Sequence, residues 1–313
     1  MSTPVTLSPP RRLVDVTVDG REVRVPEGAT ILEACEALGT EVPTLCYGDT
    51  LTPRNACRVC VVEVEGARTL VPACSRKVEE SMAVQTDSER VRHSRKMVLE
   101  LLGSSVDLST TPKADEWMDR YEARPDRFGP RAEPAPLGER DARHAGEHEP
   151  GDGAAAATVE QPAKVDNDLY VRDYGKCIMC YKCVDACGEQ WQNTFAIGIA
   201  GRGFDARVST EFDLALPDSA CVYCGNCIEV CPTGALSFRT EYEMRAEGTW
   251  DEDKQTQTTT VCTYCGVGCN VTLHVQENEI VKVTSPHDNP VTHGNLCIKG
   301  RFGFQHVQHR RQD

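Results

Sequence analysis

Cysteine is the residue whose number and spacing in this sequence could do chemistry. Seventeen cysteines occur among 313 residues, and sixteen of them fall into four groups of four. The spacing within the groups is typical of metal ligands rather than of a scattered disulfide framework. Thiolates are soft ligands that select iron–sulfur clusters, zinc or copper(I). The remaining one, Cys35, lies on the apolar face of a predicted helix, which favours a buried structural thiol over a redox role.

The first group is spaced C-x10-C-x2-C-x13-C and comprises Cys46, Cys57, Cys60 and Cys74. The stretches Pro43-Thr-Leu-Cys-Tyr and Asn55-Ala-Cys-Arg-Val-Cys resemble the N-terminal [2Fe-2S] domain of complex-I-like large subunits, iron-only hydrogenases and NAD-linked formate dehydrogenases. The resemblance covers residues 13–102 and implies a β-grasp domain with one [2Fe-2S] cluster, on a branch whose spacing differs from the plant type. A zinc site is the alternative, although the long first loop is unlike paired zinc knuckles.

Members of that family usually continue into a cluster domain that is ligated by one histidine and three cysteines. This sequence has no cysteine between Cys74 and Cys177, so the resemblance breaks off here. His93 lies in the interval, but without three cysteines it is predicted to be a solvated helix residue. The first cluster is therefore expected to dock directly against another cluster or a partner.

The second and third groups share the spacing C-x2-C-x2-C-x3-C, which is the run of bacterial two-cluster ferredoxins. Gly188 replaces the proline that would follow the first run, whereas Pro232 keeps it in the second. In that family the fourth cysteine of each run ligates the other cluster. The resemblance therefore implies two [4Fe-4S] clusters, one on Cys177, Cys180, Cys183 and Cys231, the other on Cys221, Cys224, Cys227 and Cys187. A zinc or structural reading is the alternative.

The fourth group is spaced C-x2-C-x3-C-x27-C and comprises Cys262, Cys265, Cys269 and Cys297. With the closing stretch Asn295-Leu-Cys-Ile-Lys-Gly-Arg, it resembles the N-terminal [4Fe-4S] domain of molybdenum or tungsten bis-pterin oxidoreductases, most closely cytoplasmic formate dehydrogenases. In that family a lysine just after the last cysteine bridges cluster and pterin. Lys299 occupies this position, which implies a cofactor-binding residue; an exposed lysine without that role is the alternative.

In the formate dehydrogenase family, the residues that bind pterin, metal and substrate follow the Lys-Gly-Arg stretch. This sequence ends 13 residues after Gly300, with no further cysteine, Ser/His/Asp set or phosphate-binding glycine loop. We therefore expect no catalytic residue in the chain, and an apolar patch on the pterin-facing side of the fourth group. A catalytic subunit split between two polypeptides is the favoured explanation; a truncated product and an independent electron carrier are the alternatives.

Local patterns predict some of the elements that position these cysteines. Apolar and polar residues alternate over 14–25 around Asp19-Gly20, a dipeptide favoured in hairpin turns. Thr30 and Glu33 form a capping box ahead of an apolar-periodic stretch, which predicts a short helix that ends at Gly39. A further helix is predicted near 88–102. Residues 271–275 and 280–284 are predicted to pair as a small hairpin.

We predict an α+β chain. Its parts are a β-grasp [2Fe-2S] domain at 13–102, a largely disordered linker at 103–168, a 2[4Fe-4S] ferredoxin domain at 169–240, a connector at 241–258 and a small β-rich [4Fe-4S] domain of the molybdopterin oxidoreductase type at 259–313. The linker is rich in Pro, Gly, Ala and charged residues, with helical character around residues 117–121.

Composition excludes several classes of function. The formal net charge of -14, without a cluster of Lys and Arg, argues against a nucleic-acid partner. No apolar segment approaches the roughly 18 residues of a membrane span. Arg11-Arg12 is followed by a strand pattern rather than by the apolar run of an export signal. We expect a chain of the reducing cytoplasm, without direct membrane insertion.

The leading hypothesis is an iron–sulfur electron-transfer subunit of a formate-dehydrogenase-like molybdenum or tungsten oxidoreductase. It would carry one [2Fe-2S] and three [4Fe-4S] clusters between a pterin-binding catalytic subunit and a flavin/NAD subunit or a ferredoxin. The alternative is a stand-alone electron-transfer adaptor for a hydrogenase or a complex-I-like diaphorase. A zinc-stabilised structural protein is a third hypothesis, and it predicts a colourless, redox-silent chain.

Overall fold

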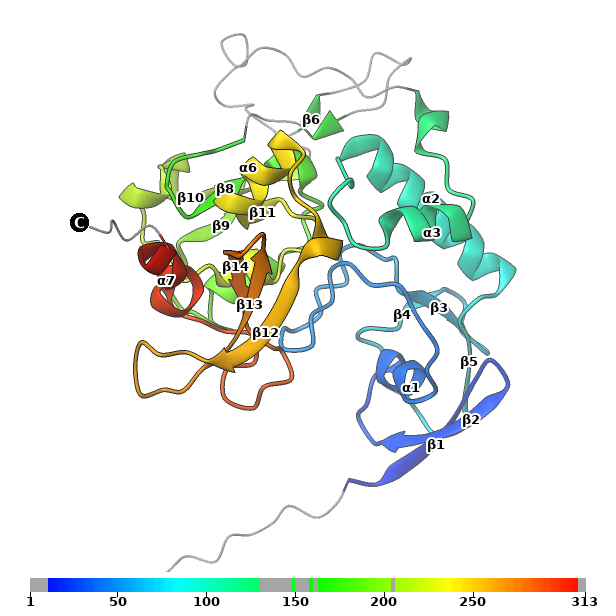
Figure 1. Cartoon of the computed structure of the whole chain (residues 1–313). Coiled ribbons are helices and arrows are strands. Elements are labelled where there is room, and N and C mark those ends of the chain that lie inside the picture. Colours follow the sequence, from blue (N-terminus) through cyan, green and yellow to red (C-terminus); the bar gives the residue numbers. More distant parts are fainter. Residues whose placement is uncertain (1–10, 130–147, 150–157, 160–162, 204–205, 309–313) are drawn as a thin grey trace, which may run out of the picture. The chain divides into compact units, whose positions relative to one another are not determined.

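The computed structural model describes residues 11–129, 148–149, 158–159, 163–203 and 206–308 (Figure 1). Helices and strands are mixed, which confirms the predicted class at this level. The chain forms two units that alternate along the sequence. Unit 1 contains Met1–Leu45, Cys57–Leu99 and Glu116–Arg124, and unit 2 contains Cys46–Ala56, Glu100–Asp115 and Pro125–Asp313.

Unit 1 is built on a five-stranded sheet in the order β2-β1-β5-β3-β4. The strands are β1 Leu13–Val18, β2 Arg21–Pro26, β3 Val61–Val64, β4 Val71–Pro72 and β5 Met82–Gln85. β1 and β2 pair antiparallel as the predicted hairpin, with Asp19 and Gly20 at positive φ in its turn. β1 also pairs parallel with β5. The apolar members of the alternating pattern, such as Val16 and Val18, are buried.

The helix α1 (Ile31–Ala37) confirms the predicted capping box. The Glu33 N–H donates to Thr30 Oγ1 at 3.2 Å, and the Glu33 carboxylate accepts from the Thr30 N–H. The apolar face of α1 is buried and includes Cys35, which is fully shielded from solvent. Burial raises the pKa of the Cys35 thiol to about 12, so this thiol stays protonated, as a structural residue should.

Part of the segment expected to be a linker is folded. Helix α2 (Glu89–Ser105) is followed by α3 (Ala114–Arg120) and a 3-10 helix at Pro125–Phe128. Trp117 and Tyr121 are buried, and the Tyr121 hydroxyl accepts a 2.7 Å hydrogen bond from buried Arg95. Arg95 also donates to the Val61 carbonyl of β3 at 3.0 Å. Farther along, β6 (His148–Glu149) pairs with β7 (Thr158–Val159); the predicted disorder at 130–147, 150–157 and 160–162 lies outside the described residues.

The larger part of unit 2 is made of short elements around one apolar core. Its strands are β8 Tyr170–Arg172, β9 Ile197–Ala200, β10 Arg207–Thr210 and β11 Leu236–Phe238, paired as β8–β11 and β9–β10. Its helices are α4 Lys182–Cys187, α5 Asn226–Glu229 and α6 Arg239–Glu247, with single 3-10 turns at Tyr174–Lys176, Glu211–Asp213 and Leu216–Asp218. The core joins Tyr170, Tyr174, Leu216, Leu236 and Phe238, and six of the eight cysteines of the two ferredoxin-type runs belong to it or pack against it.

The last part of unit 2 is a three-stranded sheet with one helix. After a 3-10 turn at Glu252–Lys254, β12 (Thr256–Val261), β13 (Asn270–Gln276) and β14 (Glu279–Thr284) pair antiparallel in that order, which confirms the predicted hairpin. Helix α7 (Ile298–Gln308) lies against β14 (Figure 1). A small core of Val271, Val283, Leu296 and Phe304 joins sheet and helix, with Cys262 and Cys269 packed against it.

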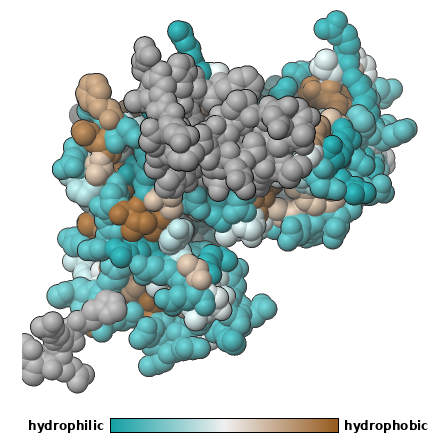
Figure 2. Space-filling model, turned by 90° about the horizontal axis from the view of Figure 1, so that it is seen from above, coloured by the Kyte–Doolittle hydropathy of each residue, from teal (hydrophilic) through white to brown (hydrophobic). Residues whose placement is uncertain are grey.

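Figure 2 shows one face on which hydrophilic residues prevail and hydrophobic patches are small and separate. Among the described residues, no helix has both the length and the apolar character that a membrane span requires.

The capping box gives a first test of the fold. Replacing Thr30 by Ala removes the acceptor of the Glu33 N–H, a loss of roughly 1 kcal/mol that corresponds to about a fivefold change in the local opening equilibrium. We expect the amide of Glu33 to exchange about fivefold faster with solvent deuterium. Thr30→Ser keeps the acceptor and should leave exchange unchanged; equal exchange in the wild type and Thr30→Ala would contradict the capping role.

Candidate iron–sulfur sites

The first cysteine group is divided between the two units. Cys57, Cys60 and Cys74 belong to unit 1, where they flank β3 and β4 and are buried. The Sγ atoms of Cys60 and Cys74 are 3.4 Å apart. The hydrogen bond between these two thiols lowers the pKa of Cys60, although burial acts in the opposite direction. Cys46 is also buried but belongs to unit 2, so its membership of this group stays a prediction.

The loop that begins with Cys46 is anchored within unit 2 next to α4. Arg54 Nε donates to Asp185 Oδ2 of α4 at 2.8 Å, and Asp185 is buried. The Thr52 N–H donates to Gln190 at 2.7 Å. Leu51 lies in the apolar core beneath. The loop 46–56 is thus fixed to the same body as the second and third cysteine groups.

The second group draws in a cysteine from the third run. Burial raises the pKa of Cys183 well above its usual value, and the thiolates that add most to this shift are those of Cys180, Cys177 and Cys231. These are the four residues that the crossed arrangement predicts for one cluster. They come from α4, the loop before it and the segment that follows α5.

The third group shows the complementary exchange. Burial is the largest cause that raises the pKa of Cys227 well above its usual value. The thiolates of Cys224, Cys187 and Cys221 add to this shift. These four cysteines line one cavity, whose other walls include Ala196, Ile197, Leu216 and Leu236. Four soft sulfur donors around an apolar cavity suit an iron–sulfur cluster, so the residues present fit this group.

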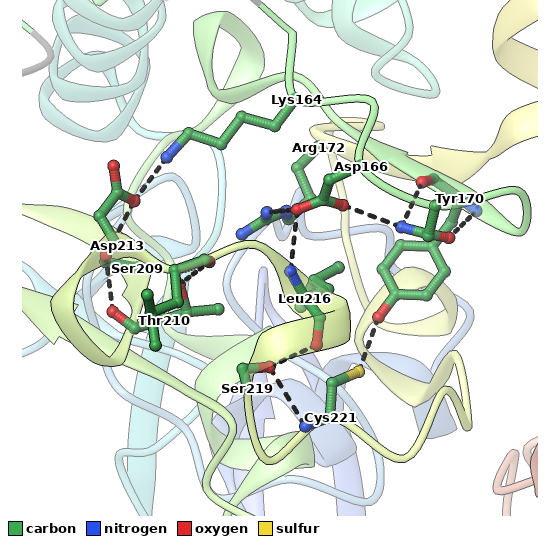
Figure 3. A network of polar contacts seen from close by, with 12 residues as sticks. Lys164, Asp166, Tyr170, Arg172, Ser209, Thr210, Asp213, Leu216, Ser219 and Cys221 are labelled. Carbon is green, nitrogen blue, oxygen red and sulfur yellow. Dashed lines mark hydrogen bonds and ion pairs between the residues drawn. The ribbon is translucent and has the colours of Figure 1, made fainter.

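Tyr170 contributes a hydrogen bond to a sulfur of the third group (Figure 3). Its hydroxyl lies 3.1 Å from Cys221 Sγ, and the tyrosine is almost fully buried. Burial, together with the nearby thiolates of Cys227 and Cys221, raises the pKa of Tyr170, so the hydroxyl keeps its proton and donates it toward sulfur. The backbone N–H of Tyr223 also donates to Cys221 Sγ, at 3.4 Å.

A buried ion pair supports the turn that leads to Cys221. Arg172 of β8 pairs with Asp166, and the same carboxylate accepts the Leu216 N–H at 2.9 Å (Figure 3). The Ser219 hydroxyl donates to the Leu216 carbonyl at 2.8 Å and accepts the Cys221 N–H at 3.2 Å. The position of Cys221 therefore depends on a continuous polar chain from β8.

The fourth group is the most accessible of the four. Cys265 and Cys297 are exposed, whereas Cys262 and Cys269 are partly buried and joined by a 2.7 Å hydrogen bond from the Cys262 N–H to the Cys269 carbonyl. Burial, together with the thiolates of Cys262, Cys265 and Cys297, raises the pKa of Cys269. Lys299 is exposed in the first turn of α7. Val261, Tyr264, Val267 and Ile298 are exposed apolar side chains close to these cysteines in sequence; the apolar patch facing a pterin stays a prediction.

No two cysteines form a disulfide within the part of the chain that the structure describes. Within the described ranges, no three His, Cys, Asp or Glu side chains surround a common point as a single metal ion requires. His93 lies on α2 in unit 1, where it lines an open groove with Arg90 and Lys96.

Two features were missed by sequence reasoning, namely the Tyr170 hydroxyl and the anchoring of loop 46–56. Tyr170 and Cys221 are 51 residues apart, and no spacing relates them. The one local signal was Arg54, a charged residue in a short loop of a cysteine group.

Comparison with known proteins identifies three domain families along the chain. Residues 11–89 match the 2Fe-2S iron-sulfur cluster binding domain, residues 176–235 the 4Fe-4S dicluster domain, and residues 255–309 the molybdopterin oxidoreductase Fe4S4 domain. The chain therefore contains three iron–sulfur domains, in the order that the cysteine spacing predicts.

Several curated proteins are similar over most of the chain. An NADH-quinone oxidoreductase subunit of Rhizobium meliloti is 32% identical over 95% of this chain and 32% of its own length. The NADP-reducing hydrogenase subunit HndD of Solidesulfovibrio fructosivorans is 38% identical over 72% of this chain and 36% of its own length. The protein named "Putative formate dehydrogenase SH0748" of Staphylococcus haemolyticus is 27% identical over 93% of this chain and 31% of its own length. The chain thus spans about a third of these relatives.

A solved structure shares the fold. An NAD⁺-reducing [NiFe]-hydrogenase in the H2-reduced state superimposes with a TM-score of 0.57 at 22% identity, covering 72% of this chain and 87% of that one.

The Tyr170 hydrogen bond predicts a shift in reduction potential. A donor to a cluster sulfur stabilises the more negative, reduced state, so Tyr170→Phe should lower the potential of the site that contains Cys221. If the bond is about 1 kcal/mol stronger in the reduced state, the shift is about 40 mV, because 59 mV equals a tenfold change for one electron. A redox titration followed by electron paramagnetic resonance measures it. Tyr242→Phe, on α6, is the control; equal potentials in Tyr170→Phe and wild type would refute the role.

Proposed function

We propose that this chain is the iron–sulfur electron-transfer part of a formate-dehydrogenase-like molybdenum or tungsten oxidoreductase. The observation that carries the proposal is the cavity lined by Cys187, Cys221, Cys224 and Cys227, in which one cysteine of the second run joins three of the third. Such an exchange joins two cluster sites into one conduit. The three domain families and the similarity to redox subunits support the same reading.

The proposed cofactors are one [2Fe-2S] and three [4Fe-4S] clusters, which exchange single electrons when bound. The ligand sets are Cys46, Cys57, Cys60 and Cys74; Cys177, Cys180, Cys183 and Cys231; Cys221, Cys224, Cys227 and Cys187; and Cys262, Cys265, Cys269 and Cys297. The protein matrix holds these sulfurs, excludes water and supplies hydrogen bonds such as that of Tyr170, which set the potentials. The β-grasp description of the first domain and the predicted domain limits form part of the same proposal.

The pterin-binding catalytic site is proposed to lie on a partner that covers the exposed face of the fourth group. Lys299 and the apolar side chains Val261, Val267 and Ile298 lie on this part of the chain, next to exposed Cys265 and Cys297. Exposed apolar side chains near a redox site fit a protein contact. A flavin/NAD subunit or a ferredoxin is proposed at the other end, and the assembly is placed in the cytoplasm.

A second candidate function is a stand-alone adaptor between a hydrogenase or complex-I-like diaphorase and other carriers. The similarity to a subunit of NADH-quinone oxidoreductase and to one of an NADP-reducing hydrogenase favours it. The two proposals differ in one requirement, because only the first needs a metal-pterin partner.

Anaerobic affinity purification of this chain from its native host separates the two. Copurifying polypeptides are identified by mass spectrometry, and iron, molybdenum and tungsten are measured in the same sample. A pterin-binding protein with stoichiometric molybdenum or tungsten is the expected result. Iron without such a partner would favour the adaptor, and a colourless preparation without iron would refute both.

The iron content of cysteine variants tests the ligand sets. Anaerobically purified wild-type chain should carry about 14 iron atoms, given one [2Fe-2S] and three [4Fe-4S] clusters. Cys60→Ala should lose about 2 iron atoms and the [2Fe-2S] signal, whereas Cys297→Ala should lose about 4. Cys35→Ala is the matched control, because Cys35 is buried but lies outside the proposed sets. Loss of iron in Cys35→Ala, or full iron in Cys60→Ala, would show the assignment to be wrong.

A further inference from the structure

Arg301 is a fully buried arginine between two of the proposed cluster sites. It lies on α7, four residues after Cys297, and its backbone N–H donates to the Cys297 carbonyl at 3.0 Å. Its side chain points to the third cysteine group, because Nε donates to the Cys224 carbonyl at 3.0 Å. One residue therefore contacts the backbone of a cysteine from each of two groups.

The two terminal nitrogens of the Arg301 guanidinium also bind residues between the third and fourth cysteine groups. One terminal nitrogen pairs with the buried carboxylate of Glu229 at the end of α5. The other donates to Asn226 Oδ1 at 3.3 Å and to the Gly294 carbonyl at 3.2 Å. Asn226 also accepts the Leu296 N–H at 3.0 Å, which adds a direct bond from α5 to the segment before Cys297.

Glu229 lies between the Arg301 guanidinium and the His287 ring. Burial alone would raise the pKa of its carboxyl group, but Arg301 and His287 outweigh burial and lower it. His287 Nε2 lies 3.6 Å from the carboxylate. Glu229 is therefore ionised and compensates the buried charge of Arg301, as a buried cation requires.

The Arg301 side chain packs tightly against the backbone of Gly225. Gly225 is at positive φ, and a Cβ atom there would lie 2.3 Å from Arg301 Cδ. The side chain is thus pressed against the turn between Cys224 and Cys227, with Phe302 on the same side. The planar guanidinium group of arginine carries five N–H donors and can make all of these hydrogen bonds at once. The ammonium group of lysine carries the same charge but cannot reproduce this geometry.

We propose that Arg301 is a positioning residue that fixes the third and fourth cysteine groups to each other and thereby sets the electron transfer between their clusters. The inference rests on the proposed function, since it takes clusters to be bound in both groups. The transfer moves one electron, so one cluster is oxidised as the other is reduced, and no proton is needed from Arg301. The contacts of Arg301 with Cys224 and Cys297 run through the backbone, so the residue acts on position rather than as a ligand.

The test compares three variants with the wild-type chain after anaerobic purification. Arg301→Lys keeps the charge and removes the fork. Arg301→Met combined with Glu229→Gln removes both charges and leaves no unpaired ion behind. Arg245→Lys is the matched control, because Arg245 lies on partly exposed α6 and its guanidinium pairs with Glu241 and Glu252 rather than with a cysteine group.

Two readouts are used. The first is the spin–spin interaction between reduced clusters in electron paramagnetic resonance, which depends on their separation. The second is deuterium exchange of the Leu296 amide and of residues 225–230, which does not depend on cluster signals. We expect Arg301→Lys and the double variant to weaken the interaction and to accelerate exchange at these amides severalfold, and Arg245→Lys to change neither.

The outcomes are distinct. Unchanged exchange and unchanged spin–spin interaction in both Arg301 variants would overturn the inference. If a variant loses iron from the fourth group, deuterium exchange alone decides: faster exchange at the Leu296 amide and at residues 225–230 supports the inference, and unchanged exchange overturns it. Absence of iron from the wild-type chain would refute the proposed function instead, so the two failures cannot be confused.

Discussion

The burial of sulfur is the constraint on which this structure depends. Thiolates bind metal, but burial disfavours the thiolate, and it raises the pKa of Cys183 and Cys227 far above the usual value. Each further thiolate in the same site raises these pKa values more, because like charges repel. Only a positively charged group at the centre can offset both effects, so cluster binding and folding must be coupled in the ferredoxin-type part of the chain.

The surrounding polypeptide has little else with which to stabilise itself. Its helices and strands are short, and its cores are small, such as the four residues that join β13, β14 and α7. Two ion pairs orient the segments that carry the cysteines. They join Arg172 with Asp166, and Arg301 with Glu229. Such pairs add modestly to stability because desolvation is costly, but they allow few alternative arrangements. A conduit that depends on distances between its sites needs this kind of restriction.

Local patterns predicted the parts of the fold that are local. The hairpin around Asp19-Gly20, the capping box of Thr30 and the pairing of β13 with β14 each depend on neighbours in sequence, and all three are present. The cysteine spacing likewise predicted the three domain families. Helical character was predicted around residues 117–121, where α3 lies. The burial of Trp117 and Tyr121 was not predicted, because composition reports the polarity of a segment and not the burial of two aromatic residues among charged ones. The hydrogen bonds of Tyr170, Arg54 and Arg301 join residues that are 51 to 131 positions apart in the sequence. No local sequence pattern predicts contacts over such separations.

The proposed exchange of cysteines between the two ferredoxin-type runs would have a consequence for biogenesis. A ribosome releases the chain from the N-terminus, so Cys177, Cys180 and Cys183 emerge long before Cys231, their neighbour in the folded protein. If these four share a cluster, a nascent chain offers only three of its sulfurs until the second run has left the exit tunnel. Cluster insertion is then a late event, and the assembly machinery must either wait for the complete domain or guard three reactive thiols during synthesis.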